Sequence, residues 1–293
     1  FWVTKATTNK SALFSGSAIQ SIVKKAIVER MKQTYRVNRF EEDGDEYPIR
    51  VFIFKDMVSI GLDTSGTSLH KRGYRVDGGI APLRETVASV LLQEMMWRRK
   101  TPLHDPFCGS GTIVIEAALY AYNVAPGFGR RFALESLPIF NANRAAEIKR
   151  IEAEKIRPDV EVRITGSDID SAAVERSRKN AEYACVTAGR ALQSIGSDAK
   201  IIRPDFVQAS FDELSAPYET GLLLCNPPYG ERIGDEEEAE KLYTQMQYLP
   251  ENFKNWEMGI ITSHKKFQEC FGKYATLLKD IKAIKTNIAK NIF

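Results

Sequence analysis

Three short segments of the chain combine residue types that could bind a small ligand and do chemistry on it. They are DPFCGSGT at 105–112, GSDID at 166–170 and NPPYGER at 226–232, and each contains or follows an apolar stretch. Between them they supply carboxylates, closely spaced glycines, and an Asn followed by two prolines. Such groups bind cofactors when they lie at the ends of strands. The three segments are therefore the candidate functional site.

The first segment has the composition of a tight ligand-binding turn. Gly109 and Gly111 lack a Cβ, so the backbone can turn sharply and approach a ligand closely. A helix expected to begin near Thr112 would offer free N–H groups to a carboxylate or phosphate, and Asp105 suits an ammonium group. A P-loop would need a Lys after the glycines, and the dinucleotide fingerprint would need a third glycine where Val114 stands. Taken alone, the turn is a weak signal: a nucleoside cofactor site is one interpretation, and a Gly-rich turn without a ligand is the other.

The second segment places an acidic residue at the end of an expected strand. In doubly wound sheets, an acid at the position of Asp168 binds the two ribose hydroxyls of a nucleotide-like cofactor. A helix N-cap is the alternative role, although Asp170 or Ser171 could provide that cap equally well. Asp105 and Asp168 are 63 residues apart, more than one β-α-β unit needs, because an insertion rich in Arg, Phe and Pro occupies 123–135.

The third segment holds polar groups rigidly at a strand end. The two prolines after Asn226 fix their φ angles and remove two backbone donors. The Asn226 amide and the backbone carbonyls are thereby held where open α/β sheets bind ligands. An Asn oxygen and a free carbonyl can accept both hydrogens of a planar exocyclic amine. Tyr229 can stack on the ring that carries this amine, at about 1–3 kcal/mol for one base.

The elements that position these segments alternate along the chain from residue 84 onward. Strands are expected within TPLHDPF, VRITGSDID, IIRPDFVQ, GLLLC and MGIITS. Helices are expected from Arg84 to about Arg98, over GTIVIEAALYAY and over AAVERSRKNAEYA. This alternation predicts an α/β fold: a doubly wound, mostly parallel, Rossmann-like sheet with helices on both faces.

The N-terminal residues predict a small α+β module. Ser17 and Gln20 match a capping box, and apolar residues at three- and four-residue spacing follow, which indicates an amphipathic helix. Lys24, Lys25 and Lys32 lie on its other faces, where phosphate contacts and simple solvation are equally good interpretations.

A hairpin is expected at 49–63, and a connector with Gly and Pro residues at 68–86. We divide the chain into a partial module at 1–68 and a larger domain at 69–293. The chain starts at Phe1, directly in apolar sequence, so we expect residues of the natural N-terminus to be missing.

Composition narrows the class of protein. Of the 293 residues, 43% are hydrophobic and 27% charged, which is typical of globular proteins and excludes disordered, collagen-like and coiled-coil classes. Residues 1–84 carry 14 basic and 9 acidic side chains, a mild indication of nucleic acid that ordinary surface variation explains equally well. No apolar run approaches the roughly 20 residues that span a bilayer, and no signal peptide is visible. We expect no membrane partner.

The cysteines and histidines do not form a metal-binding pattern. The four cysteines are far apart, at positions 108, 185, 225 and 270. This spacing disfavours a zinc site and a disulfide framework, and it favours a reducing cytoplasm. The three histidines, at 70, 104 and 264, lack partners at a suitable spacing and are interpreted as structural. Glu116 is interpreted as a residue that helps hold the start of the helix at Thr112.

Together, DPFCGSGTIVIEAA, NVAPG, GSDID and NPPYGERIG resemble the bacterial THUMP-containing class I S-adenosylmethionine-dependent RNA methyltransferases. LHKRGYR followed by APLRET is similar to the segment that joins the THUMP module to the catalytic domain in this family. The resemblance covers about 68–262, and the first 65 residues resemble the C-terminal part of a THUMP RNA-binding module. The stretch after His264 is less similar, and we interpret it as diverged or incomplete. The resemblance implies methyl transfer to N2 of guanine in large-subunit ribosomal RNA.

The resemblance also implies roles for individual residues. S-adenosylmethionine would contact Asp105, Phe107, Cys108, Gly109, Ser110, Gly111 and Thr112, mainly through its methionine part. Asp168 would bind the ribose, and Ile169 would pack on the adenine. Ser210 stands where the family usually has an Asp that contacts the adenine amine. Asn226, which also borders the cofactor, would orient the target amine together with the Pro227 carbonyl, and Tyr229 would stack the base.

Two other classes of function remain open. A DNA adenine or cytosine amino-methyltransferase also uses an NPPY segment, but no separate DNA target-recognition domain is visible. A noncatalytic RNA-binding protein could keep the fold. The intact DPFCGSGT and NPPY segments argue against that class, whereas Ser210 leaves room for it. The oligomeric state stays open.

Overall fold

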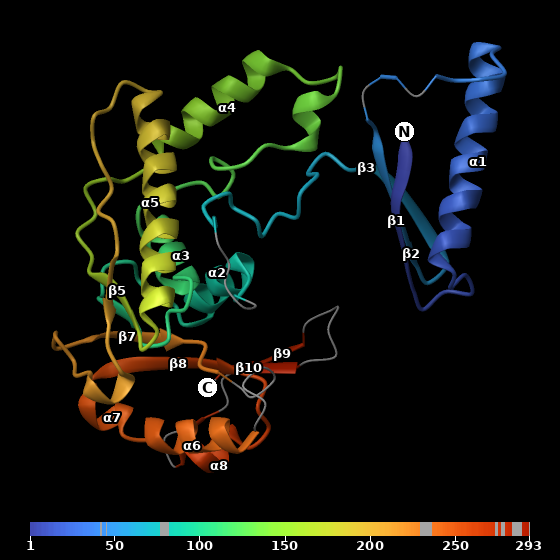
Figure 1. The fold of residues 1–293 in the computed structure, drawn as a ribbon. Coiled ribbons are helices and arrows are strands. Elements are labelled where there is room, and N and C mark those ends of the chain that lie inside the picture. The colour runs from blue at the N-terminus through green and yellow to red at the C-terminus, as the bar shows by residue number, and fades with distance from the viewer. Residues whose placement is uncertain are drawn as a thin grey trace. The chain divides into compact units, whose positions relative to one another are not determined.

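The chain forms two units, which Figure 1 shows. The first comprises Phe1–Leu69 with Arg131–Ala146, and the second comprises His70–Arg130 with Glu147–Phe293. The computed structural model describes residues 1–41, 43–44, 46–76, 82–228, 236–272, 275–276, 279–282 and 289–292. Tyr229, the residue predicted to stack the base, lies outside the described residues.

The N-terminal segment of the first unit forms a three-stranded sheet and one helix. The strands are β1 (Trp2–Asn9), β2 (Pro48–Phe54) and β3 (Met57–Leu62), with β2 in the middle. β1 is parallel to β2, and β3 is antiparallel to it. The helix α1 (Gly16–Tyr35) lies beside this sheet (Figure 1), and its core residues are Val3, Ile19, Val51 and Ile53. β1 was not among the elements expected from the sequence.

The start of α1 differs from the prediction. Ser15, not Ser17, is the N-cap, and its hydroxyl accepts a hydrogen bond from the Ala18 N–H at 3.4 Å. The Gln20 amide donates instead to the Val3 carbonyl at 2.7 Å. The capping-box prediction for Ser17 and Gln20 was therefore wrong, because Gln20 is used to tie the helix to β1.

The hairpin predicted at 49–63 is confirmed, with its turn at Lys55 and Asp56. Both residues have positive φ, 49° and 61°, as tight hairpin turns of the primed types require. The Asp56 carboxylate accepts hydrogen bonds from the Ser11 hydroxyl at 2.6 Å and the Ala12 N–H at 2.9 Å. These bonds lower the pKa of Asp56 and hold the turn to the segment between β1 and α1.

A seven-stranded sheet with the order β6-β5-β4-β7-β8-β10-β9 forms the second unit. Its strands are β4 (Leu103–Asp105), β5 (Ile164–Asp168), β6 (Asp205–Gln208), β7 (Gly221–Cys225), β8 (Trp256–Thr262), β9 (Lys279–Lys282) and β10 (Ala289–Ile292). The first five are parallel, and β10 is antiparallel to both β8 and β9. The predicted doubly wound, mostly parallel α/β fold is confirmed.

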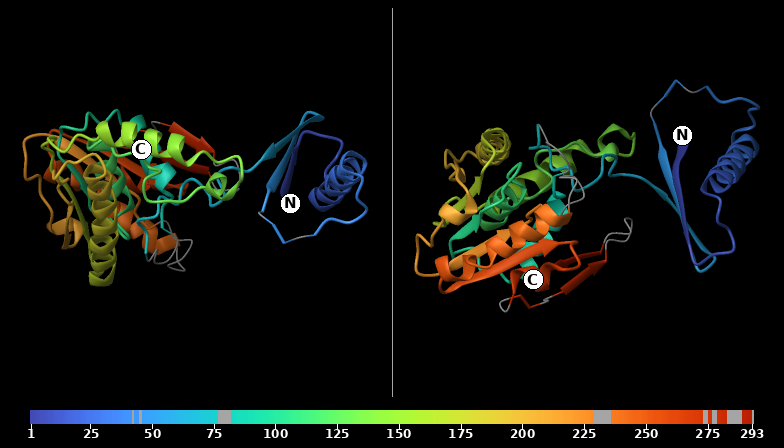
Figure 2. Two further views of the ribbon diagram at one scale, coloured as in Figure 1. Left: turned by 90° about the horizontal axis from the view of Figure 1, so that it is seen from above. Right: turned by 60° about the horizontal axis from the view of Figure 1, so that its bottom comes forward.

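Helices cover both faces of this sheet (Figures 1 and 2). One face is covered by α2 (Glu85–Glu94), α3 (Thr112–Ala121) and α5 (Ser171–Gln193), and the other by α6 (Glu236–Met246), α7 (Leu249–Asn252) and α8 (Phe267–Phe271). Side chains of β7 alternate between the two cores: Leu222 and Leu224 pack in the first, Leu223 and Cys225 in the second. All five residues of β7 are buried, as expected for a strand covered on both sides.

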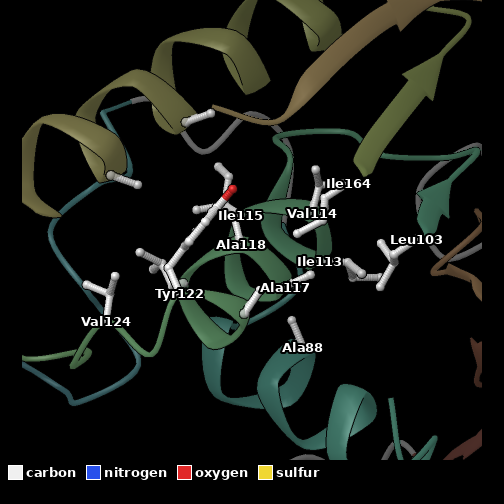
Figure 3. Close-up of a cluster of buried hydrophobic side chains, with 14 of the residues drawn as sticks. Ala88, Leu103, Ile113, Val114, Ile115, Ala117, Ala118, Tyr122, Val124 and Ile164 are labelled. Carbon is white, nitrogen blue, oxygen red and sulfur yellow. The ribbon is translucent and has the colours of Figure 1, made fainter. Parts of the chain in front are cut away.

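The helix α3 lies at the centre of the first core (Figure 3). Nine of its ten residues are buried, because the helix packs against α2, α5 and the sheet. A helix that is apolar on all sides requires such surroundings. The helix therefore has little freedom to move, and the turn before it is fixed at its C-terminal end.

The remaining described helices are η1 (Ala133–Ser136), α4 (Ala142–Glu154) and η2 (Phe211–Glu213). The helix α2 ends at Glu94, earlier than the predicted end near Arg98. None of the helices in the described part of the chain has the length and apolar character needed to cross a bilayer.

Candidate functional site

Three candidate residues lie at one edge of the sheet. Asp105 is the last residue of β4, Asp168 is the last residue of β5, and Asn226 directly follows β7. β4 pairs in parallel with β5 on one side and with β7 on the other. The order of the strands along the chain reverses between β4 and β7, and ligands of open α/β sheets bind at such a point, beyond the carboxyl ends of the strands. Parallel pairing thus brings the three segments together.

Backbone groups of the turn between β4 and α3 are bonded to β5. The Cys108 N–H donates to the Ser167 carbonyl at 2.9 Å, and the Gly109 N–H donates to the Asp168 carboxylate at 2.9 Å. The Cys108 side chain is buried, and burial raises the pKa of its thiol well above the usual range. Cys108 is therefore a packing residue, and the backbone of the turn faces the sheet edge.

The two glycines of the turn have different surroundings. Gly111 has a φ of 81°, and a Cβ there would lie 2.9 Å from the Ser177 Cβ and 3.1 Å from the Phe206 ring. Gly109 has a φ of 54°, but a Cβ there would meet no atom within 4 Å. Gly111 is therefore required by packing, whereas the space beside Gly109 is open to a ligand.

Asp105 is a buried acid at the centre of the site. Its side chain is 2% exposed, and one carboxylate oxygen accepts a hydrogen bond from the Phe107 N–H at 3.0 Å. Burial raises the pKa of Asp105 to about 8, and the nearby Asp168 carboxylate adds to this effect. No basic side chain of the described residues is among the causes of this pKa shift. A cationic group of a ligand would stabilise the ionised carboxylate here.

Asp168 is held by backbone donors on both of its oxygens. One accepts from Gly109, as above, and the other accepts from the Asp170 N–H at 3.0 Å. The N-cap of α5 is Asp170, whose carboxylate accepts from the Ala172 N–H at 2.8 Å. Asp168 is therefore not the cap, and each of its oxygens keeps a lone pair for a ligand hydroxyl.

Ile169 and Ser210 follow the neighbouring strands β5 and β6 on the same edge. Ile169 is 72% exposed, and its carbonyl accepts a hydrogen bond from the Gln208 side chain at 3.1 Å. Ser210 is half-buried, precedes η2, and its N–H donates to the Glu213 carboxylate at 3.4 Å. An exposed apolar side chain beside Asp168 is suited to packing on a planar ring.

An aromatic pair joins the turn to the segment after β6 and packs against the second core. The rings of Phe107, in the turn, and Phe211, directly after Ser210, have centroids 5.2 Å apart. Phe211 was not among the site residues expected from the sequence. Its position directly after Ser210 in FVQASFDEL was the only signal, and a lone Phe after a strand is usually a core residue.

The segment after β7 presents a buried acceptor. The Asn226 Oδ1 atom is buried and has no hydrogen-bond partner among the described residues. Pro227 is buried and Pro228 exposed. The Pro228 carbonyl accepts a hydrogen bond from the Tyr243 hydroxyl at 2.8 Å. A buried amide oxygen without a donor costs about 1–3 kcal/mol, a cost that a substrate donor would remove.

Asn180 of α5 is hydrogen-bonded to the backbone of the turn between β4 and α3. It is 1% exposed; its amide donates to the Ser110 carbonyl at 3.0 Å and accepts from the Val76 N–H at 3.0 Å. This residue was missed in the sequence. The signal is an amide residue on the buried face of α5, whose other residues are mostly Ala. Asn180 ties the turn to the connector before α2.

Arg75 of the connector contacts the start of α3. Its guanidinium donates to the Thr112 hydroxyl at 2.8 Å and to the Leu83 carbonyl at 3.0 Å, and it pairs with Glu85 at 3.4 Å. The Thr112 hydroxyl also lies 3.2 Å from the Ser110 hydroxyl. The hydroxyl groups of Ser110 and Thr112 are thereby both hydrogen-bonded within the protein.

Glu116 also bonds to the connector rather than to the start of its helix. Its carboxylate accepts from the Tyr74 hydroxyl at 3.2 Å and pairs with Arg72 at 3.5 Å. Burial raises the pKa of Glu116 to about 7, an effect that Arg72 opposes. Glu116 is a structural residue as expected, but the contact through which it acts is different.

His104 is structural, as expected from the sequence. Its two ring nitrogens bond to the Thr165 hydroxyl at 2.8 Å and to the Ser167 hydroxyl at 3.1 Å. Burial lowers the pKa of His104 to about 4, so the ring is neutral and fixes the register of β4 against β5.

Gly111→Ala should destabilise the second unit by more than the ordinary cost of a left-handed alanine, about 1–2 kcal/mol. The extra cost comes from the contact with Ser177. Gly196→Ala is the matched control, because Gly196 has a φ of 75° and a Cβ there meets nothing within 4 Å. Urea unfolding of both variants isolates the steric term. Equal losses would show that Ser177 moves aside freely.

Asp105→Asn should make the ligand-free protein more stable at alkaline pH. The pKa of Asp105 in the folded protein, about 8, lies above its ordinary value of 3.8. The protonated form therefore favours folding, and its contribution is present below about pH 4 and lost as the pH rises through about 8. Asparagine keeps a neutral side chain throughout.

The stability gain of Asp105→Asn over wild type should grow between about pH 4 and about pH 8, to the order of several kcal/mol. Urea unfolding at each pH measures it. Asp212→Asn, at an exposed carboxylate, is the control. A gain independent of pH would show that Asp105 is ionised in the free protein.

Both parts of the chain match families of known proteins. Residues 72–290 match the family described as RMKL-like, methyltransferase domain, and residues 1–63 match the THUMP domain. The match extends to residue 290, past the point near 262 where the resemblance was expected to end. The family match thus includes residues 265–290, the part of the chain that contains β9 and the start of β10.

Individual proteins are also similar to this chain over most of its length. "Putative RNA methyltransferase YpsC" of Bacillus subtilis (strain 168) is 40% identical over 269 residues, 91% of this chain and 66% of that protein. "Ribosomal RNA large subunit methyltransferase K/L" of Psychromonas ingrahamii is 36% identical over 260 residues, 86% of this chain and 33% of that protein. The crystal structure of SMU.472 complexed with SAH superposes with a TM-score of 0.81 at 31% identity, covering 99% of this chain and 73% of that one.

The chain spans 66% and 33% of the lengths of these two curated relatives. The match to the methyltransferase family nevertheless covers residues 72–290, which is most of this chain. With a THUMP domain ahead of an RMKL-like methyltransferase domain, the chain belongs to the THUMP-containing methyltransferase family that its motifs resemble, whose cofactor is S-adenosylmethionine.

Proposed function

We propose that this protein transfers a methyl group from S-adenosylmethionine to the exocyclic amine N2 of a guanine in RNA, in large-subunit ribosomal RNA. The observation that carries the proposal is the Oδ1 atom of Asn226, which is buried and has no hydrogen-bond partner among the described residues. Asn226 directly follows β7, the strand beside β4, and β4 ends in Asp105. A methyl acceptor with N–H groups fits an orphaned oxygen at this place. The names of the two curated relatives support RNA, and that of the second supports ribosomal RNA.

The residues at the sheet edge fit the cofactor. Asp105 would receive the ammonium group of the methionine part, which would stabilise its buried carboxylate. The open space beside Gly109 and the N–H groups at the start of α3 would accommodate the carboxylate of the same part. Phe107, Cys108, Ser110, Gly111 and Thr112 would shape this turn.

The other half of the cofactor would lie along β5 and β6. Asp168 would bind the ribose hydroxyls through its free lone pairs, and the exposed Ile169 would pack on the adenine. Ser210 would stand beside the adenine edge, where relatives of this family usually have an Asp. The serine hydroxyl can accept only more weakly than a carboxylate, so this contact would contribute less.

Positioning supplies most of the rate enhancement in this mechanism. The bound cofactor supplies a methyl group that its sulfonium already activates. The Asn226 Oδ1 atom and the Pro227 carbonyl would accept the two amine hydrogens, which pulls the nitrogen lone pair out of ring conjugation and aims it at the methyl group. No general base is required, because the proton can leave after transfer. Tyr229 would stack the base, which must first leave its helix stack.

The first unit would supply binding to RNA. Residues 1–63 match the THUMP domain, and the exposed Lys24 and Lys25 lie along α1. We propose residues 1–68 as a partial RNA-binding module and 69–293 as the catalytic domain. Phosphate contacts from such lysines would raise affinity for RNA without regard to sequence.

The experiment that tests this function is methyl transfer from labelled S-adenosylmethionine to unmodified ribosomal RNA, tRNA and DNA in parallel. The products are digested to nucleosides and identified by mass. Label in N2-methylguanosine from ribosomal RNA is the expected result. Label in methyladenine or methylcytosine from DNA would replace the proposal with a DNA amino-methyltransferase. Cofactor binding without any label would replace it with a noncatalytic RNA-binding protein.

Asn226→Ala should lower turnover by at least about 100-fold, because the amine loses the acceptor that orients it. The affinity for S-adenosylmethionine should change little, since Asp105 and Asp168 provide its main polar contacts. Turnover at saturating cofactor and equilibrium binding of cofactor measure the two effects separately. Asn252→Ala, at an exposed position of α7, is the control. If turnover survives in Asn226→Ala, another residue orients the amine.

A further inference from the structure

Tyr243 connects the core beneath the sheet to the segment that carries Asn226. Its side chain is fully buried in α6, and its ring packs edge-on against Phe267, with centroids 4.9 Å apart, and against His264, at 5.4 Å. Its hydroxyl lies 2.8 Å from the Pro228 carbonyl oxygen and 3.1 Å from the Thr262 hydroxyl. The ring is thus fixed by packing, and the hydroxyl has a defined place.

The protons of these hydroxyl groups can be assigned by counting donors. A carbonyl only accepts, so the single proton of the Tyr243 hydroxyl goes to Pro228. The Thr262 hydroxyl must then donate its proton to the Tyr243 oxygen. The Thr262 oxygen in turn accepts a hydrogen bond from the backbone N–H of His264 at 3.1 Å. The result is a directional chain of hydrogen bonds from the end of β8 to the Pro228 carbonyl.

This chain of hydrogen bonds matters because the two prolines after Asn226 offer few backbone groups for hydrogen bonding. Pro227 and Pro228 have no N–H groups, so their carbonyls are the only backbone groups through which hydrogen bonds can hold them. Tyr243 takes the Pro228 carbonyl. The Pro227 carbonyl is the one assigned to the target amine. A shift of about 1 Å in such a segment can cost about 100-fold in rate.

We propose that Tyr243 and Thr262 are positioning residues for methyl transfer. They fix the Pro228 carbonyl and thereby set the direction of the Asn226 side chain and the Pro227 carbonyl toward the amine. This inference rests on the proposed function of Asn226 and extends it to two further residues. Tyr243 lies in α6 and Thr262 in β8, outside the three segments that the sequence motifs define.

Tyr243→Phe tests the proposal, because it removes the hydrogen bond and keeps the buried ring. We expect kcat to fall on the order of ten- to a hundredfold, with little change in the dissociation constant of S-adenosylmethionine. Tyr122→Phe is the matched control. Tyr122 is 1% exposed, belongs to the other core (Figure 3), and bonds to the backbone of Ile202.

Two variants of Thr262 separate positioning from packing. Thr262→Val keeps the shape and removes the hydroxyl, so it should lower kcat as Tyr243→Phe does. Thr262→Ser keeps the hydroxyl and should retain most of kcat. The double variant Tyr243→Phe/Thr262→Val should be no slower than the slower single variant, because both break one chain.

The outcomes distinguish this inference from the proposed function. Wild-type protein that methylates no nucleic acid contradicts the proposed function itself. Wild-type activity on RNA with an unchanged kcat in Tyr243→Phe overturns the positioning role alone. A loss of cofactor affinity in parallel with kcat, or an equal loss in Tyr122→Phe, also overturns it, since a merely structural role would produce both.

Discussion

The buried carboxylate of Asp105 is the constraint on which the second unit depends. It lies at the end of the central strand β4, 2% exposed, with a pKa raised to about 8 by burial and by the nearby Asp168. An acid in such a place lowers the stability of the empty fold at neutral pH. Natural sequences keep such residues where a ligand offsets the cost. Under the proposed function, the ammonium group of the cofactor would offset this cost.

The rest of the site is rigid because residues from distant parts of the chain hold its backbone. Asn180 and Arg75 fasten the turn before α3, and Tyr243 fastens the Pro228 carbonyl. Glycines at 109 and 111 allow the turn, and only the second is packed against neighbours. Methyl transfer from an activated donor gains mostly from orientation, so a site of this kind needs fixed acceptors more than it needs acids or bases.

The strands β4, β5 and β7 were predictable because each is a short run of mostly buried residues that ends in a polar motif. Parallel pairing brings the polar ends of these three strands to one edge of the sheet, as expected. Tertiary contacts escaped prediction: Gln20 bonds to β1 instead of capping α1, and Glu116 bonds to the connector. Asn180 and Tyr243 were invisible for the same reason, since their partners are 70 and 15 residues away along the chain.

Proton release on cofactor binding tests whether Asp105 receives the ammonium group of the cofactor. Calorimetric titration of the protein with S-adenosylmethionine at about pH 7, in buffers of different ionisation enthalpy, gives the number of protons released. Asp105 has a pKa of about 8 in the free protein and would be ionised beside the cofactor's ammonium group. Close to one proton should therefore leave per cofactor bound in the wild type, and close to none in Asp105→Asn. The same release from both proteins, or from neither, would contradict the account.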